Sequence, residues 1–448
     1  MKTNWFDKKV LILGLSKSGI SAAKYLNNKG ADVYITEINE VAQEKYQELL
    51  DLGINVEVGH HSDEFVKDSY LAITSPGIPP QTEIFNRLKE EKVPVISEVE
   101  LAYKESLKPF IAITGTNGKT TTTALTAHIL KEEYKAEACG NIGLPPCDLL
   151  NNDLDYFVLE VSSFQLHYSD AFQAQIACWL NFTPDHVNWH GSLENYFNDK
   201  AKIFKFPQAP AFAILNAKDE KLVEFSEECP STVFFFAEKR GENACYTENN
   251  EMLYMRNGNI EKIIDVNEIP LLGEHNYQNV MCAVICAKLV GISNENIVKA
   301  IKSFKVPAHR FEFVTEKKGI KFYNDSKATN PESSIVAINS FNNGENVALI
   351  AGGRDKNTDL TEFCESIKNH ITSVILIGEA ADRFEENLRN SGFNNIYRES
   401  TFEGAIDKSV ALNPNVVLLS PACASFDMFS GYEQRGDVFK DYVLSKVQ

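Results

Sequence analysis

The sequence lacks the features of a membrane or secreted protein. It contains no run of roughly 18 apolar residues, the length that a membrane-spanning helix requires. The polar segment from Met1 to Lys9 is not followed by an apolar stretch of signal-peptide length. We therefore expect a soluble protein of the cytoplasm, without membrane insertion.

The sequence also lacks an excess of positive charge and any paired cysteine motif. Its 62 acidic and 44 Lys and Arg residues give a net charge of −18, whereas nucleic-acid-binding proteins normally carry a basic field. The nine cysteines are scattered, without a Cys-x-x-Cys pair, which is typical of reduced thiols in a cytosol. We expect no nucleic-acid partner, and an anionic substrate must be bound by locally placed Lys and Arg side chains.

The 448 residues contain 44% hydrophobic and 24% charged side chains, an ordinary globular composition that is long enough for two to four domains. Apolar strands and helical segments alternate along the chain, which predicts an α/β fold. We expect three domains: a Rossmann-like domain at 1–97, a central domain with a mostly parallel sheet of the P-loop ATPase type at 98–306, and a C-terminal Rossmann-like domain at 307–448.

The segment after the apolar run 110–113 lacks one glycine of the general P-loop, since Ile113 stands in its place. The remaining pattern predicts a strand, a glycine-rich turn and a helix, in which backbone N–H groups and the helix N-terminus face a phosphate. Lys119 would reach the β- and γ-phosphates, and the Thr120 hydroxyl would bind Mg²⁺. The alternative is a turn that only happens to contain Gly-Lys-Thr. The predicted ATP-binding residues of this loop are Gly115, Thr116, Asn117, Gly118, Lys119, Thr120 and Thr121.

The first domain opens like a dinucleotide fold but lacks its middle glycine. A strand at 10–13, a turn from Gly14 to Gly19 and a second strand that ends at Glu37 fit the pattern, yet Ser16 occupies the glycine position. Another nucleotide is therefore favoured over NAD. The loop Ser75-Pro76-Gly77 follows a third strand at 71–73, where ligands of open sheets bind. Both loops could instead be simple connections.

Two further predicted strands end in side chains that suit a metal ion. The strand 155–160 ends at Glu160, and the strand 176–180 leads to His186. In one sheet with a phosphate loop, these groups and Thr120 are expected to hold Mg²⁺ beside the phosphates. His186 and His190 also have His-x-x-x-His spacing, but Pro184 and Gly191 disfavour a long helix, so zinc is the weaker alternative.

Two polar groups later in the middle segment have open roles. Lys200 lies in a predicted helix at 195–204, where spacing alone indicates a solvated surface lysine. His275, Asn276 and Asn279 share the start of an apolar helix that runs to Val290, and they could contact a purine edge or a ribose. Helix N-capping by Asn276 is the alternative.

Polar and often cationic loops follow the predicted strands of the last segment. These strands are expected at 321–323, 347–351, 374–377 and 416–419. Lys327 and Arg354 lie in the loops after two of these strands, and Arg310 lies near the start of the segment, shortly after Pro307. Positive groups at one sheet edge of an acidic protein indicate a bound polyanion.

Five motifs together resemble the Mur ligases over essentially the whole chain. They are Gly-Thr-Asn-Gly-Lys-Thr at 115–120, Gly-Glu-His-Asn at 273–276, Asn-Asp-Ser-Lys-Ala-Thr-Asn at 324–330, Ser-Pro-Ala-Cys-Ala-Ser-Phe-Asp at 420–427 and Glu-Gln-Arg-Gly at 433–436. The fourth motif favours the member that adds D-glutamate to the L-alanyl carboxylate of UDP-N-acetylmuramoyl-L-alanine. The resemblance implies an ATP-dependent amide ligase of peptidoglycan precursor synthesis, acting through an acyl phosphate and functioning as a monomer.

The resemblance also implies roles for individual residues. The catalytic set is Lys119, His186 and Lys200, and the metal set for two Mg²⁺ ions is Thr120, Glu160, His186 and Lys200, with Lys200 carbamylated by CO₂. The UDP substrate would contact Leu15, Ser16, Glu37, Ser75, Pro76, Gly77 and Asn141. ATP would also contact Asn276, Asn279, Arg310, Asp325 and Lys327. D-glutamate would contact Thr329, Lys356, Ser425 and Tyr432, where Tyr432 replaces the Phe of other members.

Other interpretations remain open at this point. A folylpolyglutamate synthase shares the ATP-binding core and adds glutamate, but it needs no nucleotide-type domain at 1–97. Other Mur ligases add different amino acids. A nucleotide-sensing binding module would apply if Glu160 and Lys200 had no catalytic role, and an NAD-dependent oxidoreductase is disfavoured by Ser16.

Overall fold

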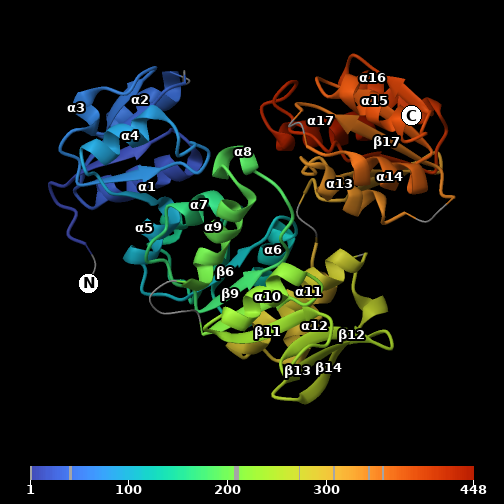
Figure 1. Cartoon of the computed structure of the whole chain (residues 1–448), viewed down its shortest axis with the longest axis horizontal. Coiled ribbons are helices and arrows are strands. Elements are labelled where there is room, and N and C mark those ends of the chain that lie inside the picture. Colours follow the sequence, from blue (N-terminus) through green and yellow to red (C-terminus); the bar gives the residue numbers. More distant parts are fainter. Residues whose placement is uncertain are drawn as a thin grey trace. The chain divides into compact units, whose positions relative to one another are not determined.

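The computed structural model describes residues 3–39, 43–205, 211–271, 273–305, 308–341, 344–355 and 358–447. The chain divides into two compact units, Met1–Phe304 and Lys305–Gln448 (Figure 1, blue to yellow and orange to red). The first unit contains two mainly parallel sheets and the second contains one, so the predicted α/β class with Rossmann-like parts is confirmed. None of the described helices combines the length and the apolar character that a membrane span requires.

The first sheet is wholly parallel, with the order β3-β2-β1-β4-β5. Helices cover both faces, because side chains alternate along each strand: Val10 and Ile12 pack with α1 and α5, whereas Leu11 and Leu13 pack with α3 and α4. The strands are Lys9–Leu13 (β1), Asp32–Glu37 (β2), Asn55–Val58 (β3), Leu71–Thr74 (β4) and Val95–Ser97 (β5). The helices are Lys17–Asn28 (α1), Gln43–Asp51 (α2), Asp63–Val66 (α3), Glu83–Glu90 (α4) and Glu98–Glu105 (α5).

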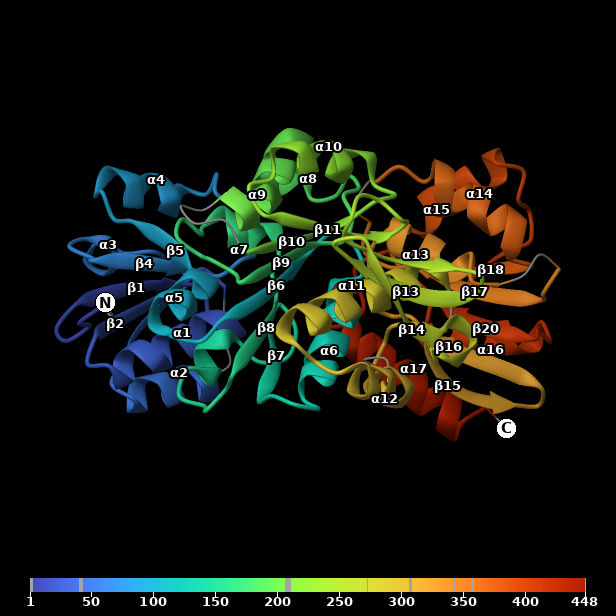
Figure 2. The same cartoon turned by 90° about the horizontal axis from the view of Figure 1, so that it is seen from below.

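The second sheet has the order β14-β13-β12-β11-β10-β9-β6-β8-β7, and Figure 2 shows β9, β6, β8 and β7 side by side. The pairs among β6 to β12 are parallel, whereas the β12–β13 and β13–β14 pairs are antiparallel. The strands are Phe110–Thr114 (β6), Ala136–Gly140 (β7), Tyr156–Glu160 (β8), Ile176–Trp179 (β9), Phe212–Asn216 (β10), Thr232–Ala237 (β11), Ala244–Glu248 (β12), Glu251–Arg256 (β13) and Asn259–Asp265 (β14). The predicted strands at 110–113, 155–160 and 176–180 are therefore confirmed as β6, β8 and β9.

Helices also cover the second sheet on both faces. Ala177 and Trp179 face the core that includes α7, α9 and α10, so the alternation along β9 turns Cys178 toward the opposite face. The helices are Lys119–Leu130 (α6), Ser163–His167 (α7), Val187–His190 (α8), Leu193–Lys205 (α9), Glu220–Glu228 (α10), Glu274–Val290 (α11) and Asn294–Ser303 (α12), with short 3₁₀ turns at Pro146–Leu149 and Val266–Glu268. Helices α6 and α11 pack against each other.

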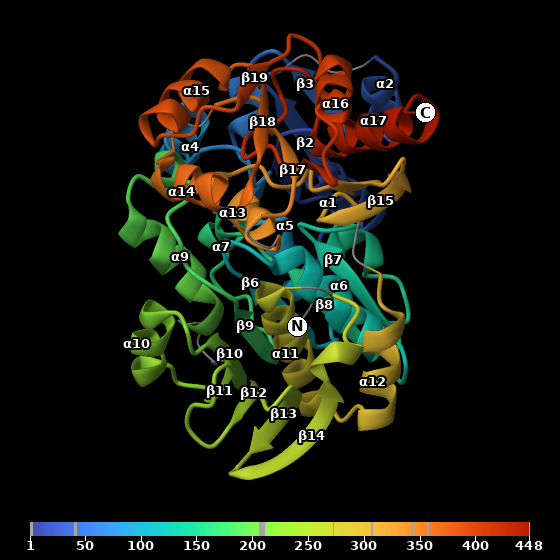
Figure 3. The same ribbon diagram turned by 90° about the vertical axis from the view of Figure 1, so that its right-hand side faces the viewer.

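The third sheet has the order β15-β16-β20-β17-β18-β19 and is parallel except for β15. Helices α13, α14 and α15 pack on one face and α16 and α17 on the other (Figure 3). The strands are Glu312–Lys317 (β15), Ile320–Asn324 (β16), Val347–Gly352 (β17), Ser373–Ile377 (β18), Ile396–Arg398 (β19) and Val416–Leu419 (β20). The helices are Pro331–Ile338 (α13), Thr361–His370 (α14), Ala381–Asn390 (α15), Phe402–Ala411 (α16) and Tyr432–Ser445 (α17).

Candidate active site

The loop between β6 and α6 has the backbone of a phosphate-binding turn. Gly118 caps α6 with a φ of +82°, and a Cβ there would lie 2.6 Å from Asn279 Oδ1. Gly115 has a φ of +154°, and its Cβ would lie 3.0 Å from the Cβ of Leu180. Both positions need glycine for conformation and for space. At these two positions the loop itself places no side chain beside the N-terminus of the helix.

Asn181, which directly follows β9 and Leu180, fixes the shape of this loop. Its Oδ1 accepts hydrogen bonds from the backbone N–H groups of Thr116 (3.0 Å) and Asn117 (2.8 Å), and its Nδ2 donates to Asn117 O at 3.1 Å. Parallel pairing of β6 with β9 brings the two strand ends together. The sequence alone indicates no role for Asn181, because only the sheet order reveals this contact.

Two lysines converge on one carbonyl of the loop. Lys119 Nζ donates to the oxygens of Gly115 (2.9 Å) and Thr116 (2.7 Å), and Lys200 Nζ donates to Gly115 O at 2.8 Å. Lys200 is only 2% exposed, so the surface position that its spacing suggested is wrong. Burial first, and then the charge of Lys119, hold the pKa of Lys200 well below its usual value, although Asp185 raises it. This electrostatic environment suits a bound anion.

Glu160 ends β8 at the same sheet edge. Residues Ile113 and Glu160 are paired across β6 and β8, which places the carboxylate beside the start of the phosphate loop. Glu160 is 1% exposed, and its Oε1 accepts a hydrogen bond from Asn141 Nδ2 at 3.0 Å. Glu160, a predicted metal ligand, is therefore hydrogen-bonded to Asn141, a predicted contact of the UDP substrate.

His186 lies in the loop that leads into the short helix α8, with a φ of +54°. Its backbone N–H donates to Asp185 Oδ1, and its Nε2 lies 3.4 Å from Asp185 Oδ2. His190 Nδ1 instead faces Asp199 Oδ2 at 2.8 Å, and His190 Nε2 lies 3.0 Å from Ser163 Oγ. The two histidines of the His-x-x-x-His spacing therefore have different partners, which removes the basis for a shared zinc site.

Helix α11 begins earlier than the capping alternative requires. Gly273 is its N-cap, so Asn276 is already its third residue and does not cap it. Asn279 Nδ2 donates to Asn276 Oδ1 at 3.4 Å, and Asn279 Oδ1 accepts from Thr122 Oγ1 of α6 at 3.1 Å. The alternative of N-capping by Asn276 is wrong. Asn279 lies against the phosphate loop, and Asn276 is connected to that loop through it.

Hydrogen bonds also connect the predicted UDP-binding loops of the first sheet. Glu37 Oε2 accepts from the backbone N–H of Leu15 at 2.9 Å. Partial burial raises the pKa of Glu37, but hydrogen bonds from Asn39 and Leu15 outweigh it and lower that pKa. Ser16 Oγ lies 2.7 Å from Ser75 Oγ. Pro76 and Gly77 continue the second loop, with Gly77 exposed.

The remaining candidates lie in the second unit. Asp325 follows β16, its Oδ2 accepts from Ser420 Oγ at 2.7 Å, and burial raises its pKa to about 7. Lys327 Nζ lies 4.9 Å from the centroid of the Tyr432 ring. Ser425 is 2% exposed. Arg310 and Thr329 are half-buried in loops on either side of Asp325.

Two further residues of this unit are Lys356, which was predicted to contact D-glutamate, and Arg435, for which no role was predicted. Lys356 lies outside the described residues, whereas its neighbour Asp355 is held by Arg383 through bonds of 2.6 and 2.7 Å. Arg435 is 1% exposed and donates to Ser326 O and Cys423 O at 2.7 and 3.1 Å. Its motif was noted in the sequence, but its structural task of joining the loops after β16 and β20 was not.

Comparisons with known proteins agree with this architecture. Residues 8–97 match the MurD-like N-terminal domain of Mur ligases, residues 113–287 the Mur ligase middle domain, and residues 309–423 the Mur ligase glutamate ligase domain. The UDP-N-acetylmuramoylalanine–D-glutamate ligase of Thermoanaerobacter pseudethanolicus is 39% identical, with 97% of this chain and 98% of the relative covered.

Two solved structures have the same fold. The UDP-N-acetylmuramate-alanine ligase MurC from Thermotoga maritima aligns with a TM-score of 0.61 at 20% identity, covering 98% of this chain and 99% of that one. The MurF ligase from the same organism, solved with ADP, has a TM-score of 0.61 at 16% identity and covers both chains fully. The domain matches and the full-length 39% identity lead to one conclusion: this chain belongs to the Mur ligase family.

Proposed function

We propose that this protein is the ATP-dependent ligase that adds D-glutamate to the L-alanyl carboxylate of UDP-N-acetylmuramoyl-L-alanine, with release of ADP and phosphate. The full-length relative of that name supports this assignment. The observation that carries it is the sheet edge where the phosphate loop, with Lys119 and Lys200 on one carbonyl, adjoins the buried Glu160 and its partner Asn141.

We assign the binding of the three substrates to three domains. The domain at 1–97 binds the UDP part of the substrate through Leu15, Ser16, Glu37 and the loop 75–77, together with Asn141. The domain at 98–306 binds ATP, and the domain at 307–448 binds D-glutamate and also contributes Arg310, Asp325 and Lys327 to ATP. The match of residues 8–97 to a MurD-like domain disfavours a folylpolyglutamate synthase. We place the enzyme in the cytoplasm as a monomer.

The chemistry follows from the poor reactivity of a carboxylate toward an amine. Lys119 and the N-terminus of α6 neutralise the γ-phosphate, so that the L-alanyl carboxylate attacks it in line and displaces ADP. The resulting acyl phosphate accepts the D-glutamate amine, the tetrahedral intermediate expels phosphate, and an amide remains. His186, beside Asp185, contributes to the polar surroundings of the developing oxyanion.

The donor set at this edge suits Mg²⁺ in part. The Glu160 carboxylate and the Thr120 hydroxyl, 1% and 2% exposed, are the hard oxygen ligands that Mg²⁺ prefers, whereas the imidazole of His186 is a less typical one. Bound Mg²⁺ supplies charge neutralisation at the phosphate oxygens. Glu160, Thr120 and His186 would hold it, and Asn141 would keep the Glu160 carboxylate in position through its 3.0 Å hydrogen bond.

An unmodified Lys200 does not fit as a metal ligand, because an ammonium group has no lone pair to donate. We propose that its amine adds to CO₂, loses a proton and becomes a carbamate, an oxygen ligand for a second Mg²⁺. Its complete burial beside Lys119 favours the neutral amine, the form that attacks CO₂.

The test is phosphate release from ATP and Mg²⁺ with UDP-N-acetylmuramoyl-L-alanine, comparing D-glutamate, L-glutamate, meso-diaminopimelate and L-alanine. We expect release with D-glutamate alone. Release with another amino acid would support a ligase that acts on a different substrate. No release with any of them would contradict the ligase assignment and favour a nucleotide-sensing binding module.

A further inference from the structure

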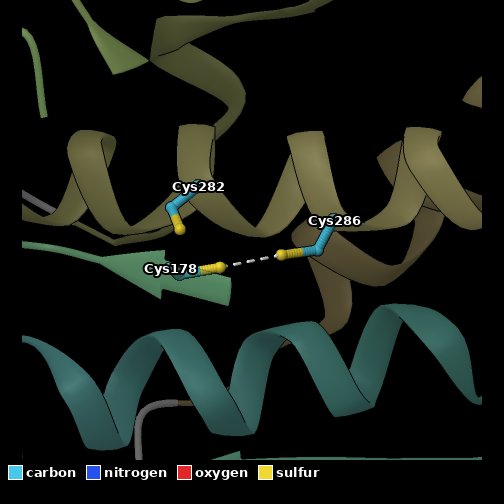
Figure 4. Close-up of side chains that lie close together, drawn as sticks. All are labelled: Cys178, Cys282 and Cys286. Carbon is cyan, nitrogen blue, oxygen red and sulfur yellow. Dashed lines mark hydrogen bonds between the residues drawn. The ribbon is translucent and has the colours of Figure 1, made fainter. Parts of the chain in front are cut away.

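Three cysteines of the first unit meet on the face of the second sheet that packs against α11 (Figure 4). Cys178 comes from β9, and Cys282 and Cys286 are one turn apart on α11. Their sulfur atoms lie within 4.8 Å of one another, with Cys178 Sγ and Cys286 Sγ at 3.4 Å. Each of the three residues is 0% exposed, and none of them belongs to the catalytic or substrate-binding set.

The geometry of these three sulfurs matches a three-coordinate metal ion. A cation about 2.3 Å from each of three sulfurs requires sulfur–sulfur distances of about 4 Å. The separation of 3.4 Å between Cys178 and Cys286 and the upper limit of 4.8 Å for all three pairs are close to that value. Among the described residues, no His, Asp or Glu joins the group. Soft thiolate ligands select Cu(I), zinc and iron–sulfur clusters. Structural zinc sites and iron–sulfur clusters take four protein ligands, so the number of ligands favours Cu(I) here.

Complete burial keeps solvent away from the three sulfurs. Metal binding would replace the thiol protons, because the thiolate is the form of cysteine that ligates a metal.

We propose that Cys178, Cys282 and Cys286 form a buried binding site for a soft, thiophilic cation, with Cu(I) as the occupant that matches three sulfur ligands without a fourth ligand among the described residues. Cu(I) enters as Cu⁺ and bonds to three thiolates, and each thiol that becomes a ligand releases its proton to solvent. Binding therefore needs no oxidant or reductant.

An ion at this site would connect two elements that support the phosphate loop. Strand β9 leads through Leu180 to Asn181, which fixes Thr116 and Asn117. Helix α11 carries Asn279, whose Oδ1 accepts from Thr122. Bonds from the ion to Cys178 on one side and to Cys282 and Cys286 on the other would connect β9 with α11. This would stabilise the first unit against unfolding, because a ligand that binds only the folded state adds its binding energy.

The experiment is an anaerobic Cu(I) titration of the full-length protein against a competing Cu(I) chelator. The parent carries Cys229→Ser, because Cys229 is the one cysteine of the nine that is not fully buried. Loading is done at room temperature and during brief warming below the melting transition, since the site is closed. We expect one retained copper, three sulfur ligands by X-ray absorption and a higher melting temperature.

Two variants identify the ligands. Cys282→Ala should lose the retained copper and the melting shift, whereas Cys139→Ala, which removes another fully buried cysteine on β7, should keep both. If Cys282→Ala does not fold, thiol alkylation of the loaded parent decides, because bound copper should protect Cys178, Cys282 and Cys286 selectively. Retention by Cys282→Ala, equal loss in Cys139→Ala, or no retention by the parent would show that the cluster only fills the core.

Discussion

The molecule contains two strand–turn–helix loops that share a backbone plan but differ in charge. In the first sheet, Gly14 follows β1 and the loop N–H of Leu15 bonds to the carboxylate of Glu37 at 2.9 Å. In the second sheet, Gly115 follows β6 and the loop N–H groups bond to the neutral amide of Asn181. One loop is thus fixed by an anion and the other by an amide.

This difference decides which ligand each loop can accept. A fixed carboxylate repels a polyphosphate but accepts hydrogen bonds from uncharged donors of a nucleotide. In the second loop, the N–H groups of Thr116 and Asn117 donate to the Asn181 amide, and Lys119 and Lys200 donate to the Gly115 carbonyl. The shared backbone geometry therefore predicts nucleotide binding at both places, and we propose the second loop as the ATP site because of these two lysines.

The largest expected effect comes from removing the charge of the second loop. Lys119→Ala should lower kcat/KM for ATP by about 10³-fold or more, since the lysine stabilises charge on the transferred phosphoryl group. Steady-state phosphate release measures this. Lys131→Ala, an exposed change just beyond the end of the same helix, should have normal activity, and full activity of Lys119→Ala would refute the phosphate-loop assignment.

Lys200→Ala should lower kcat by about 100-fold, because a charged ligand of the site is lost. Short carboxylic acids such as acetate should restore part of this activity by replacing the carbamate oxygens. Lys202→Ala is the matched control on the same helix, since Lys202 Nζ bonds to His167 O instead, and acetate should not change its rate. If acetate does not raise the rate of Lys200→Ala, the proposed carbamate is wrong.

Asn181→Asp tests the comparison between the loops more finely. It keeps the oxygen that accepts from Thr116 and Asn117, replaces the Nδ2 that donates to Asn117 O with an oxygen, and adds the negative charge that the first loop has. At about 6 Å from a phosphate charge this costs about 2–3 kcal/mol, or roughly 100-fold in Kd for ATP. Binding calorimetry measures it against Asn151→Asp, an exposed site. An unchanged Kd would show that loop charge is not decisive.

The last prediction concerns folding stability, not activity, at the two loop glycines. Gly118→Ala and Gly14→Ala place a Cβ 2.6 Å from Asn279 Oδ1 and 2.8 Å from Ser75 Oγ, both at positive φ, whereas Gly53→Ala has positive φ with nothing within 4 Å. We expect about 1 kcal/mol of destabilisation at Gly53 and about 2–4 kcal/mol at the other two. Denaturant unfolding gives the values, and equal losses at all three would mean that both loops relax freely.

The sequence predicted the strands that carry the site because their apolar runs end in glycine or polar residues. Phe110 to Ile113 and Ile176 to Leu180 were recognised in this way, and a helix was expected after the glycine-rich turn, where α6 begins at Lys119. These signals are local, since backbone conformation at a glycine depends on few neighbours.

Contacts that depend on the order of strands could not be predicted. Asn181 is 64 residues from Asn117 in sequence, and only the parallel pairing of β6 with β9 brings them together. The burial of Lys200 did leave a signal, because Tyr196, Ile203 and Phe204 put apolar residues at helical spacing around it, and all three are buried. The cysteine cluster required both kinds of information: the Cys282–Cys286 spacing is local, but Cys178 is not.

The most direct test of the account measures the equilibrium binding of ATP and of UDP-N-acetylmuramoyl-L-alanine separately to the wild type, Lys119→Ala and Glu37→Gln. We expect Lys119→Ala to lose ATP binding and to bind the UDP substrate normally. We expect Glu37→Gln to bind the UDP substrate about tenfold more weakly and to bind ATP normally. Loss of both ligands in either variant, or the reverse pattern, would contradict the assignment of the two loops.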